Sequence, residues 1–473
     1  MILSRRISGA VTDMTEGNAG QLILRFSLPL IFGNLFQQLY AIVDAVVVGR
    51  YVGVDALASV GCISWVCWMI NAFLRDCANT FSISASVRVG NHNEKGFRMI
   101  VANAALICVF LGTLVTAVLL GGIPVILRLL NVQPNVVHMT RQYLTVFILA
   151  IPVGLVYSVA TGLLRAYGNS GITFLSMTVS TVVNIVLDLV FVLGFGWGVQ
   201  GAAAATWIAQ VVAMVIALRA VAREPAFHIG REDLRLDKAL LGELLRLWLP
   251  MLFNSLIISV GGLFVESRTN RIGSSFTAGI TACMKVFSVM EAIIMAIQTG
   301  VSVYVGQNLG AGQFSCIRTG LVKVVKLGFA VTAVMILFVF AVQHRVLPLF
   351  LSAEDPAAYE RAYWVANADT HIILLSMLLM TPMYLHRVTI QTMGFPAYAA
   401  LAGVMQLVMR VLTIQFGPAV FGEYAYFVHD GLAWLVSLPV VAIPCYRYLG
   451  KRIAEEKLAE EKKIVFTGRK EKL

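Results

Sequence analysis

Long apolar segments separated by short polar ones dominate this chain. Each segment holds about 20 residues, the length that an α-helix needs to cross a bilayer at about 1.5 Å per residue. Turn sequences such as Gly90-Asn91-His92-Asn93 and Gly310-Ala311-Gly312 separate the segments. The pattern predicts about twelve transmembrane helices, near residues 24–48, 56–80, 99–120, 137–160, 171–193, 200–221, 245–267, 279–303, 321–343, 362–385, 398–420 and 425–448.

The amino-acid composition agrees with membrane insertion. Hydrophobic residues make up 59% of the 473 residues and charged residues 13%, whereas soluble proteins carry about 45–50% apolar and about 25% charged residues. The seven cysteines form no C-x-x-C pair and no cluster with histidine, so they indicate neither a disulfide framework nor a metal site. We therefore predict an all-α integral membrane protein.

The net charge of +11 indicates membrane orientation rather than nucleic-acid binding. A basic stripe on a folded domain, the usual mark of nucleic-acid binding, is missing. Lysine and arginine instead concentrate in alternate polar segments, as in the cytoplasmic loops of membrane proteins. This distribution predicts an even number of spans with both termini in the cytoplasm. The rich segments include Arg5, Arg6, Arg88, Lys95, Arg98, Arg318, Lys323, Lys326, Arg387 and the basic tail, and the poor ones hold only Arg50, Arg128, Arg141, Arg268, Arg271, Arg345 and Arg361.

The two halves of the chain resemble each other. Ser27-Leu28-Pro29 opens the first half and Trp248-Leu249-Pro250 the second, and Val89-Gly90-Asn91 matches Val305-Gly306-Gln307. Internal duplication is a feature of transporters whose substrate path lies between the repeats. We predict two pseudo-symmetric six-helix lobes around a central cavity. The predicted boundaries are 1–222 for the first lobe, 223–245 for a cytoplasmic linker, 246–448 for the second lobe and 449–473 for a charged cytoplasmic tail.

Four polar residues are expected at one depth in the first lobe. Asp44 lies about 18 residues into the first span, and Asn184 and Asp188 share a helix face because they are four residues apart. Thr206 lies about six residues into the returning sixth span. Two carboxylates in an apolar interior favour retaining a proton, and with the amide and hydroxyl oxygens they can also bind Na⁺. We predict an ion-coupling site, the alternative being hydrogen bonding that merely joins helices.

Further charges fall inside other predicted spans. Arg75 and Asp76 lie in the second span, and Lys285 and Glu291 lie in the eighth. Arg75 and Glu291 occupy equivalent positions in the two halves. Their placement predicts an ion pair between the lobes, acting either as a gate or as a static buried pair.

Three other residues are candidates for smaller roles. Glu266 is either the second-half counterpart of Asp44 or the partner of Arg268 at the outer interface, and we favour the second interpretation. Arg410, in the eleventh span, has no partner visible from the sequence. Pro29 should interrupt the hydrogen bonds of the first span and bend it.

Several stretches together resemble one family. The first span, Leu28-Pro29-Leu30 and Gln38-Leu39-Tyr40-Ala41-Ile42-Val43-Asp44, is similar to that of the MATE (multidrug and toxic compound extrusion) family in its bacterial DinF/MepA-like branch. Residues 184–188, 198–206 and 305–312 are similar to later motifs of that branch. The resemblance implies twelve helices in two lobes, and antiport in which an inward H⁺ or Na⁺ gradient drives export of amphipathic, often cationic, drugs. It implies ion coupling by Asp44, Asn184, Asp188 and Thr206.

Departures from the family pattern keep other substrates open. Arg75-Asp76, Lys285 and Arg410 would suit an anionic or zwitterionic metabolite, or a lipid-linked precursor carried by a flippase. Neither H-E-x-x-H nor G-x-S-x-G occurs, so we predict no enzyme, and the duplicated halves argue against a channel. We expect a monomer in the plasma (inner) membrane of a bacterium, with a small amphipathic substrate, no nucleic-acid partner and no cofactor besides the coupling ion.

Overall fold

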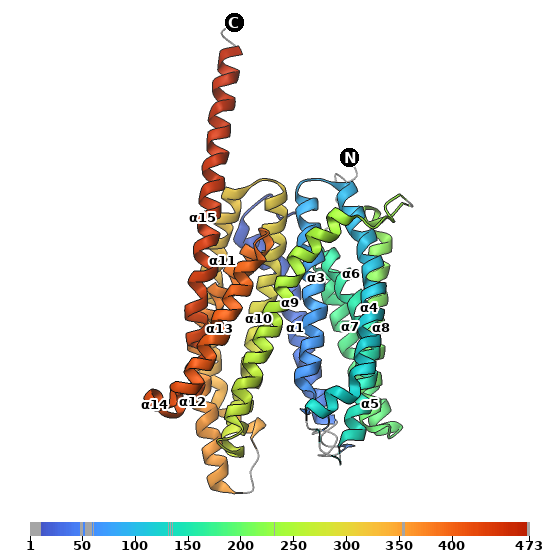
Figure 1. Ribbon diagram of the computed structural model, residues 1–473, viewed down its shortest axis with the longest axis vertical. Coiled ribbons are helices and arrows are strands. Elements are labelled where there is room, and N and C mark those ends of the chain that lie inside the picture. Colours follow the sequence, from blue (N-terminus) through green and yellow to red (C-terminus); the bar gives the residue numbers. More distant parts are fainter. Residues whose placement is uncertain are drawn as a thin grey trace.

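The computed structural model describes residues 11–47, 51, 52, 59, 61–130, 132, 134, 136–230, 232–351 and 355–470, and excludes the side chains of 45, 46 and 459–470. Arg5, Arg6 and Arg50, which entered the charge argument, lie outside the described residues. All regular elements in the described part of the chain are helices, most of them nearly parallel to the long axis of the molecule (Figure 1).

The helices divide between the two halves of the chain. The first half holds α1 (Ala19–Val47), α3 (Ser64–Gly90), α4 (Glu94–Leu129), α5 (Val137–Leu149), α6 (Ile151–Ala166), α7 (Gly171–Asp188), the π-helix η2 (Leu189–Gly194) and α8 (Gly198–Arg223). The second half holds η3 (Pro225–Phe227), α9 (Lys238–Thr269), α10 (Ser274–Gly310), α11 (Phe314–Val346), η4 (Leu347–Phe350), α12 (Pro356–Thr392), α13 (Pro396–Phe416), α14 (Pro418–Phe421), η5 (Gly422–Tyr424) and α15 (Ala425–Lys470).

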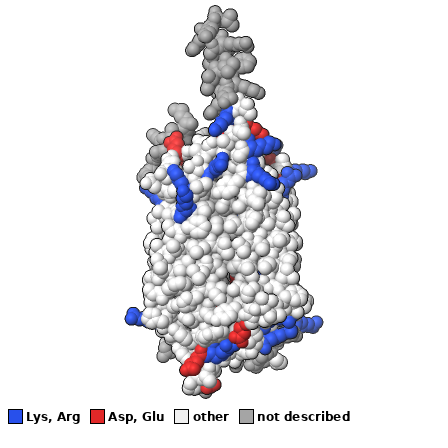
Figure 2. All heavy atoms as spheres, turned by 90° about the vertical axis from the view of Figure 1, so that its left-hand side faces the viewer, with Lys and Arg blue, Asp and Glu red and all other residues white. Residues whose placement is uncertain are grey.

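The predicted class, an all-α multi-pass membrane protein, is confirmed. Ten helices of the described chain are long and apolar enough to cross a membrane, and α5 with α6, bent by 42°, adds an eleventh crossing. Helix α3 is less apolar than these helices because it carries Arg75 and Asp76. Its 27 residues nevertheless extend over about 40 Å, which is long enough to cross a membrane. A broad, mostly uncharged band separates the charged ends of the face in Figure 2.

Several helix boundaries differ from the predicted spans. α3 begins and ends eight to ten residues later than predicted, and α9 begins at Lys238, inside the predicted linker. The rest of that linker packs on the first lobe, where Phe227 is buried and Asp233 pairs with Arg98 at 3.7 Å. α15 continues as a helix through the predicted tail to Lys470.

Helix α1 packs against both lobes. Ile23, Phe26 and Leu30 belong to the hydrophobic core of the second lobe. The Asn34 side chain donates to the Ala292 carbonyl of α10 at 3.0 Å. On the other side, α1 lies directly against α7. Pro29 lies inside α1 without ending it, so the bend predicted there stays a prediction.

The lobes meet most closely at the end of the bundle that carries both termini, here called the terminal end (Figure 1). A Cβ at Gly90 of α3 would overlap the backbone carbonyl of Gln307 on α10. A Cβ at Gly310 would likewise overlap the carbonyl of Val87. The absence of side chains at these glycines lets the two helix backbones touch.

A short N-terminal segment, residues 11–17, bridges the lobes at the same end. The Thr12 amide donates to the Gly168 carbonyl of the first lobe at 2.9 Å. Two residues later, the Met14 amide donates to Gln307 Oε1 at 2.9 Å, and the Met14 side chain is fully buried in the core of the second lobe. Gln307 also donates to the Ala166 carbonyl at 2.9 Å, so one side chain of α10 ties the segment to both lobes.

Candidate functional site

The predicted residues of α7 and α8 come together in the first lobe. Asn184 and Asp188 are both buried, and Asp188 has no exposed surface. With its amide oxygen toward Thr206, Asn184 accepts from Thr206 Oγ1 and donates to Asp188 Oδ2, each at 3.3 Å. The i, i+4 spacing therefore does place the two side chains on one face.

Asp44 completes this group from α1. Its carboxylate lies near enough to that of Asp188 for the two negative charges to repel each other. The hydroxyl groups of Tyr40 and Tyr143 also lie close enough to interact electrostatically with both carboxylates. Asp44 Oδ1 and Asp188 Oδ1 are both buried without a hydrogen-bond partner in the described chain. Val43, next to Asp44, packs on an apolar cluster that includes Val192 of the π-helix. The structure thus brings all four predicted residues together.

The backbone next to Asp188 is irregular. Asp188 ends α7, and the π-helix Leu189–Gly194 follows without a break. Single π-helical turns inside α-helices are frequent at functional sites. The amino-acid sequence does not reveal this turn, because six residues are too few to distinguish a π-helical from an α-helical hydrophobic period.

The group fits a proton or a monovalent cation. Two buried carboxylate oxygens lack partners, and an amide oxygen and a hydroxyl lie beside them, which is the oxygen donor set that Na⁺ prefers. Nowhere among the described residues do three His, Cys, Asp or Glu side chains gather in a metal-binding cluster. Two carboxylates that repel each other in a largely apolar setting are stabilised by a compensating positive charge, which either ion supplies.

A second polar group, the interlobe polar layer, consists of Arg75, Asp76, Glu291, Tyr384 and Arg387. Asp76 accepts from Ser255 at 2.6 Å, and Glu291 accepts from the Tyr384 hydroxyl at 3.1 Å. Arg75 is exposed, lies 5.8 Å from the ring centre of Trp68, and acts on Glu291 only at longer range. The predicted Arg75–Glu291 ion pair is therefore wrong as a direct contact, and the hydrogen bond that Glu291 does make comes from Tyr384.

Other predicted charges also found different partners. Glu266 accepts from the Trp65 indole, while Arg268 donates to Gln415 at 2.8 Å, so the favoured Glu266–Arg268 pair does not form. Lys285 is exposed rather than buried.

Some functional candidates were missed in the sequence. Arg387 was assigned to a cytoplasmic segment, but α12 continues to Thr392 and the Arg387 side chain is only 7% exposed. Asp369, 2% exposed on the same helix, lay inside a predicted span and was overlooked, although a single aspartate there was a visible signal. Arg410 does have a partner, since its guanidinium contacts Asp430 of α15 at 2.6 Å.

The Arg410–Asp430 pair should be important for stability. Both side chains are only 12–13% exposed. Replacing Arg410 with Met should lower the free energy of unfolding by about 3–5 kcal/mol, because Asp430 is left charged and unpaired. The double variant Arg410→Met, Asp430→Leu should regain most of this loss. Thermal unfolding in detergent measures both, and a double variant no better than the single one would contradict the interpretation.

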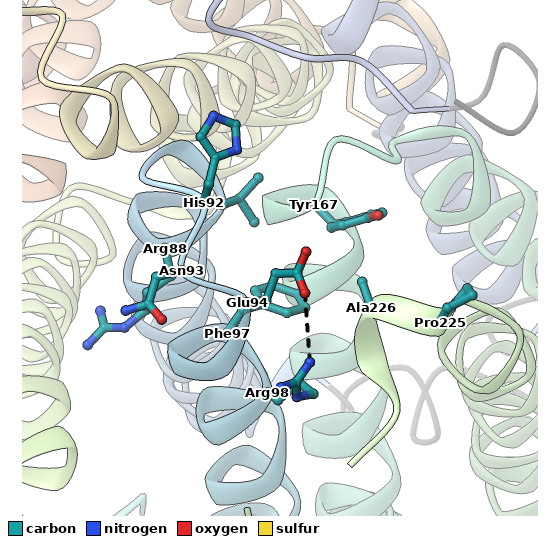
Figure 3. Close-up of a pocket in the computed structure, with 10 residues that line it drawn as sticks. Arg88, His92, Asn93, Glu94, Phe97, Arg98, Tyr167, Pro225 and Ala226 are labelled. Atoms are coloured by element: carbon teal, nitrogen blue, oxygen red, sulfur yellow. Dashed lines mark ion pairs between the residues drawn. The ribbon is translucent and has the colours of Figure 1, made fainter. Parts of the chain in front are cut away.

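The two described cavities lie within single lobes. One, of about 40 Å³, opens at the terminal end of the first lobe between the α3–α4 loop, Tyr167 and Pro225 (Figure 3). Glu94 and Arg98 pair inside it, whereas Arg88 points away. The other, of about 170 Å³, lies at the opposite end between α10 and α12. Neither cavity is lined by Asp44 or Asp188. The central cavity between the lobes stays a prediction.

Two repeated helical lobes that cross the membrane together define a multi-pass transporter rather than an enzyme. The MatE family model matches residues 29–190 and 250–416, one match in each half. The chain therefore belongs to the MatE family.

Relatives and solved structures agree with this assignment. "Probable multidrug resistance protein YoeA" of Bacillus subtilis is 29% identical over 340 residues, covering 70% of this chain and 73% of that protein. "Multidrug export protein MepA" of Staphylococcus aureus is 22% identical over 429 residues, covering 89% and 92%. A MATE family transporter described as outward-facing superposes with a TM-score of 0.87 at 21% identity, covering 95% of this chain and all of that one. This likeness confirms the fold.

Proposed function

We propose that this chain is an antiporter that exports amphipathic small molecules, including drugs, in exchange for H⁺ or Na⁺. The relatives YoeA and MepA, named for multidrug resistance and export, support the transported class. The observation that carries ion coupling is the pair of carboxylates of Asp44 and Asp188, each with one buried oxygen that lacks a hydrogen-bond partner.

The four side chains would act as one ion site. Asp44 and Asp188 hold a proton, or bind Na⁺ together with the Asn184 oxygen and the Thr206 hydroxyl. A bound ion neutralises the repulsion between the carboxylates, so loss of the ion favours a different spacing of α1 and α7. Because α1 contacts both lobes, such a shift changes how the lobes meet. Alternating access follows if α3 and α10 separate at the terminal end when the opposite end closes.

The proposal places the terminal end in the cytoplasm and the protein in the plasma (inner) membrane of a bacterium, as a monomer. The positive-inside rule supports this orientation. The packed contact between Gly90 and Gln307 then closes the cytoplasmic side, with the other side available to release substrate.

The test is dye export from proteoliposomes under imposed gradients. We expect a pH gradient or a Na⁺ gradient, applied separately, to drive accumulation of a fluorescent amphipathic dye, and the effective ion identifies the coupling. Dissipating that gradient with an ionophore should stop transport. If neither gradient moves any amphipathic dye through folded protein, but a lipid-linked precursor crosses, then the antiport proposal is wrong.

A further inference from the structure

The interlobe polar layer contains both signs of charge within the membrane. Arg75 lies midway along α3, and its side chain is exposed. A charged side chain is costly against acyl chains, and charged residues of membrane helices mostly face the bundle interior or a water-filled cavity. Arg75 lies on α3, which packs against α10 of the opposite lobe, and Glu291 of α10 is within its electrostatic influence.

Arg387 is the buried cation of this layer, and its hydrogen-bond donors have no partner among the described residues. Its side chain is 93% buried, yet the guanidinium makes no hydrogen bond to any described residue, and Nη1 is fully enclosed. The guanidinium instead lies over the Tyr384 ring, 4.3 Å from the ring centre. Arg410, by contrast, is neutralised by Asp430 at 2.6 Å.

The nearby carboxylates do not use the donors of Arg387. Asp76 and Glu291 are close enough to interact electrostatically with it. However, Asp76 accepts from Ser255 and Glu291 accepts from Tyr384. A buried guanidinium without hydrogen-bond acceptors is costly, and an anionic ligand is one way to remove that cost.

We infer that Arg387 binds a carboxylate of the transported molecule, so that this chain prefers amphipathic acids, above all zwitterions, over purely cationic amphipaths. This inference rests on the proposed export function and names its substrate class. The planar guanidinium matches a carboxylate through two parallel hydrogen bonds, and the Tyr384 ring fixes its plane. The negative charges of Asp76 and Glu291 attract a basic group of the same ligand. A zwitterion therefore matches the charges of the interlobe polar layer best.

A matched pair of dyes tests the inference. Rhodamine B carries a free carboxylate beside its cationic ring system, and its ethyl ester blocks that carboxylate. Fluorescence anisotropy with the purified full-length protein in detergent gives the Kd of each dye without any gradient. We expect the parent to bind the acid about tenfold to a hundredfold more tightly than the ester, as charge-assisted hydrogen bonds allow.

Variants assign the preference to one side chain. Arg387→Gln should bring the ratio of the two Kd values near one, because it weakens binding of the acid alone. Arg387→Lys keeps the positive charge but loses the two parallel hydrogen-bond donors of the guanidinium, so it should retain part of the preference for the acid. Lys95→Gln removes an exposed cation from the start of α4, at the terminal end, and should leave the ratio unchanged. Thermal unfolding shows whether each variant is folded.

The outcomes separate this inference from the proposed function. The inference is overturned if the parent binds the acid no better than the ester, or if folded Arg387→Gln keeps the full preference for the acid. In that case, gradient-driven export of either dye would still support the antiport proposal. If the preference and its loss are seen but no gradient moves either dye, Arg387 remains the binding residue and the antiport proposal fails instead.

Discussion

Asp44→Asn and Asp188→Asn should each reduce gradient-driven dye export to the level of protein-free liposomes, a loss of about tenfold or more, equivalent to at least ~1.4 kcal/mol. Asparagine has nearly the shape of aspartate, but it neither releases a proton at physiological pH nor neutralises a cation. The substituted site would then neither bind nor release the coupling ion when a gradient is applied, and the exchange cycle would stop.

These substitutions should not unfold the protein. Asp188 has no exposed surface and one oxygen without a partner, so a neutral amide removes a buried charge that the protein does not compensate. We expect both variants to unfold at a temperature equal to or above that of the parent.

A matched control lies in the other half of the chain. Glu266, which the repeat aligns with Asp44, is exposed and accepts from the Trp65 indole, so Glu266→Gln should keep most of the transport. Full coupled transport by Asp188→Asn, or an equal loss in Glu266→Gln, would show that the carboxylate pair is not the coupling site.

Gly90→Ala should destabilise the conformation in which the terminal end is closed. The new Cβ would lie 2.6–2.7 Å from the carbonyl carbon and Cα of Gln307, which are backbone atoms and cannot rotate away. Overpacking of this kind costs typically ~1–3 kcal/mol, and a backbone contact places it at the upper end of that range. We expect a lower unfolding temperature in detergent together with slower gradient-driven export.

Gly121→Ala provides the control for the same chemical change. Gly121 lies inside α4, and a Cβ there would meet nothing within 4 Å. Alanine favours a helix over glycine by about 1 kcal/mol, so this variant should be as stable as the parent or more stable. If Gly90→Ala and Gly121→Ala behave alike, the contact between α3 and α10 does not hold the lobes together.

The carboxylate site could be predicted because its geometry is largely local. Spans of known length fix the depth of Asp44 and Thr206, and a four-residue spacing fixes the shared face of Asn184 and Asp188. The ends of the spans were less predictable. α12 runs seven residues past its predicted end, and Arg387 was therefore assigned to a loop although it is buried.

The amino-acid sequence determined the class of this protein, its repeated halves and the group around Asp188, since hydrophobic length, repeat spacing and helical periodicity are properties of the chain alone. Only the tertiary structure decided the partners of the remaining charges. Tyr384 contacts Glu291 across 93 residues of sequence, and Asp430 contacts Arg410 across 20. Such pairs depend on the rotation and offset of packed helices, because a shift of one residue turns a side chain by about 100°. The same packing leaves Arg387 enclosed and its donors unused.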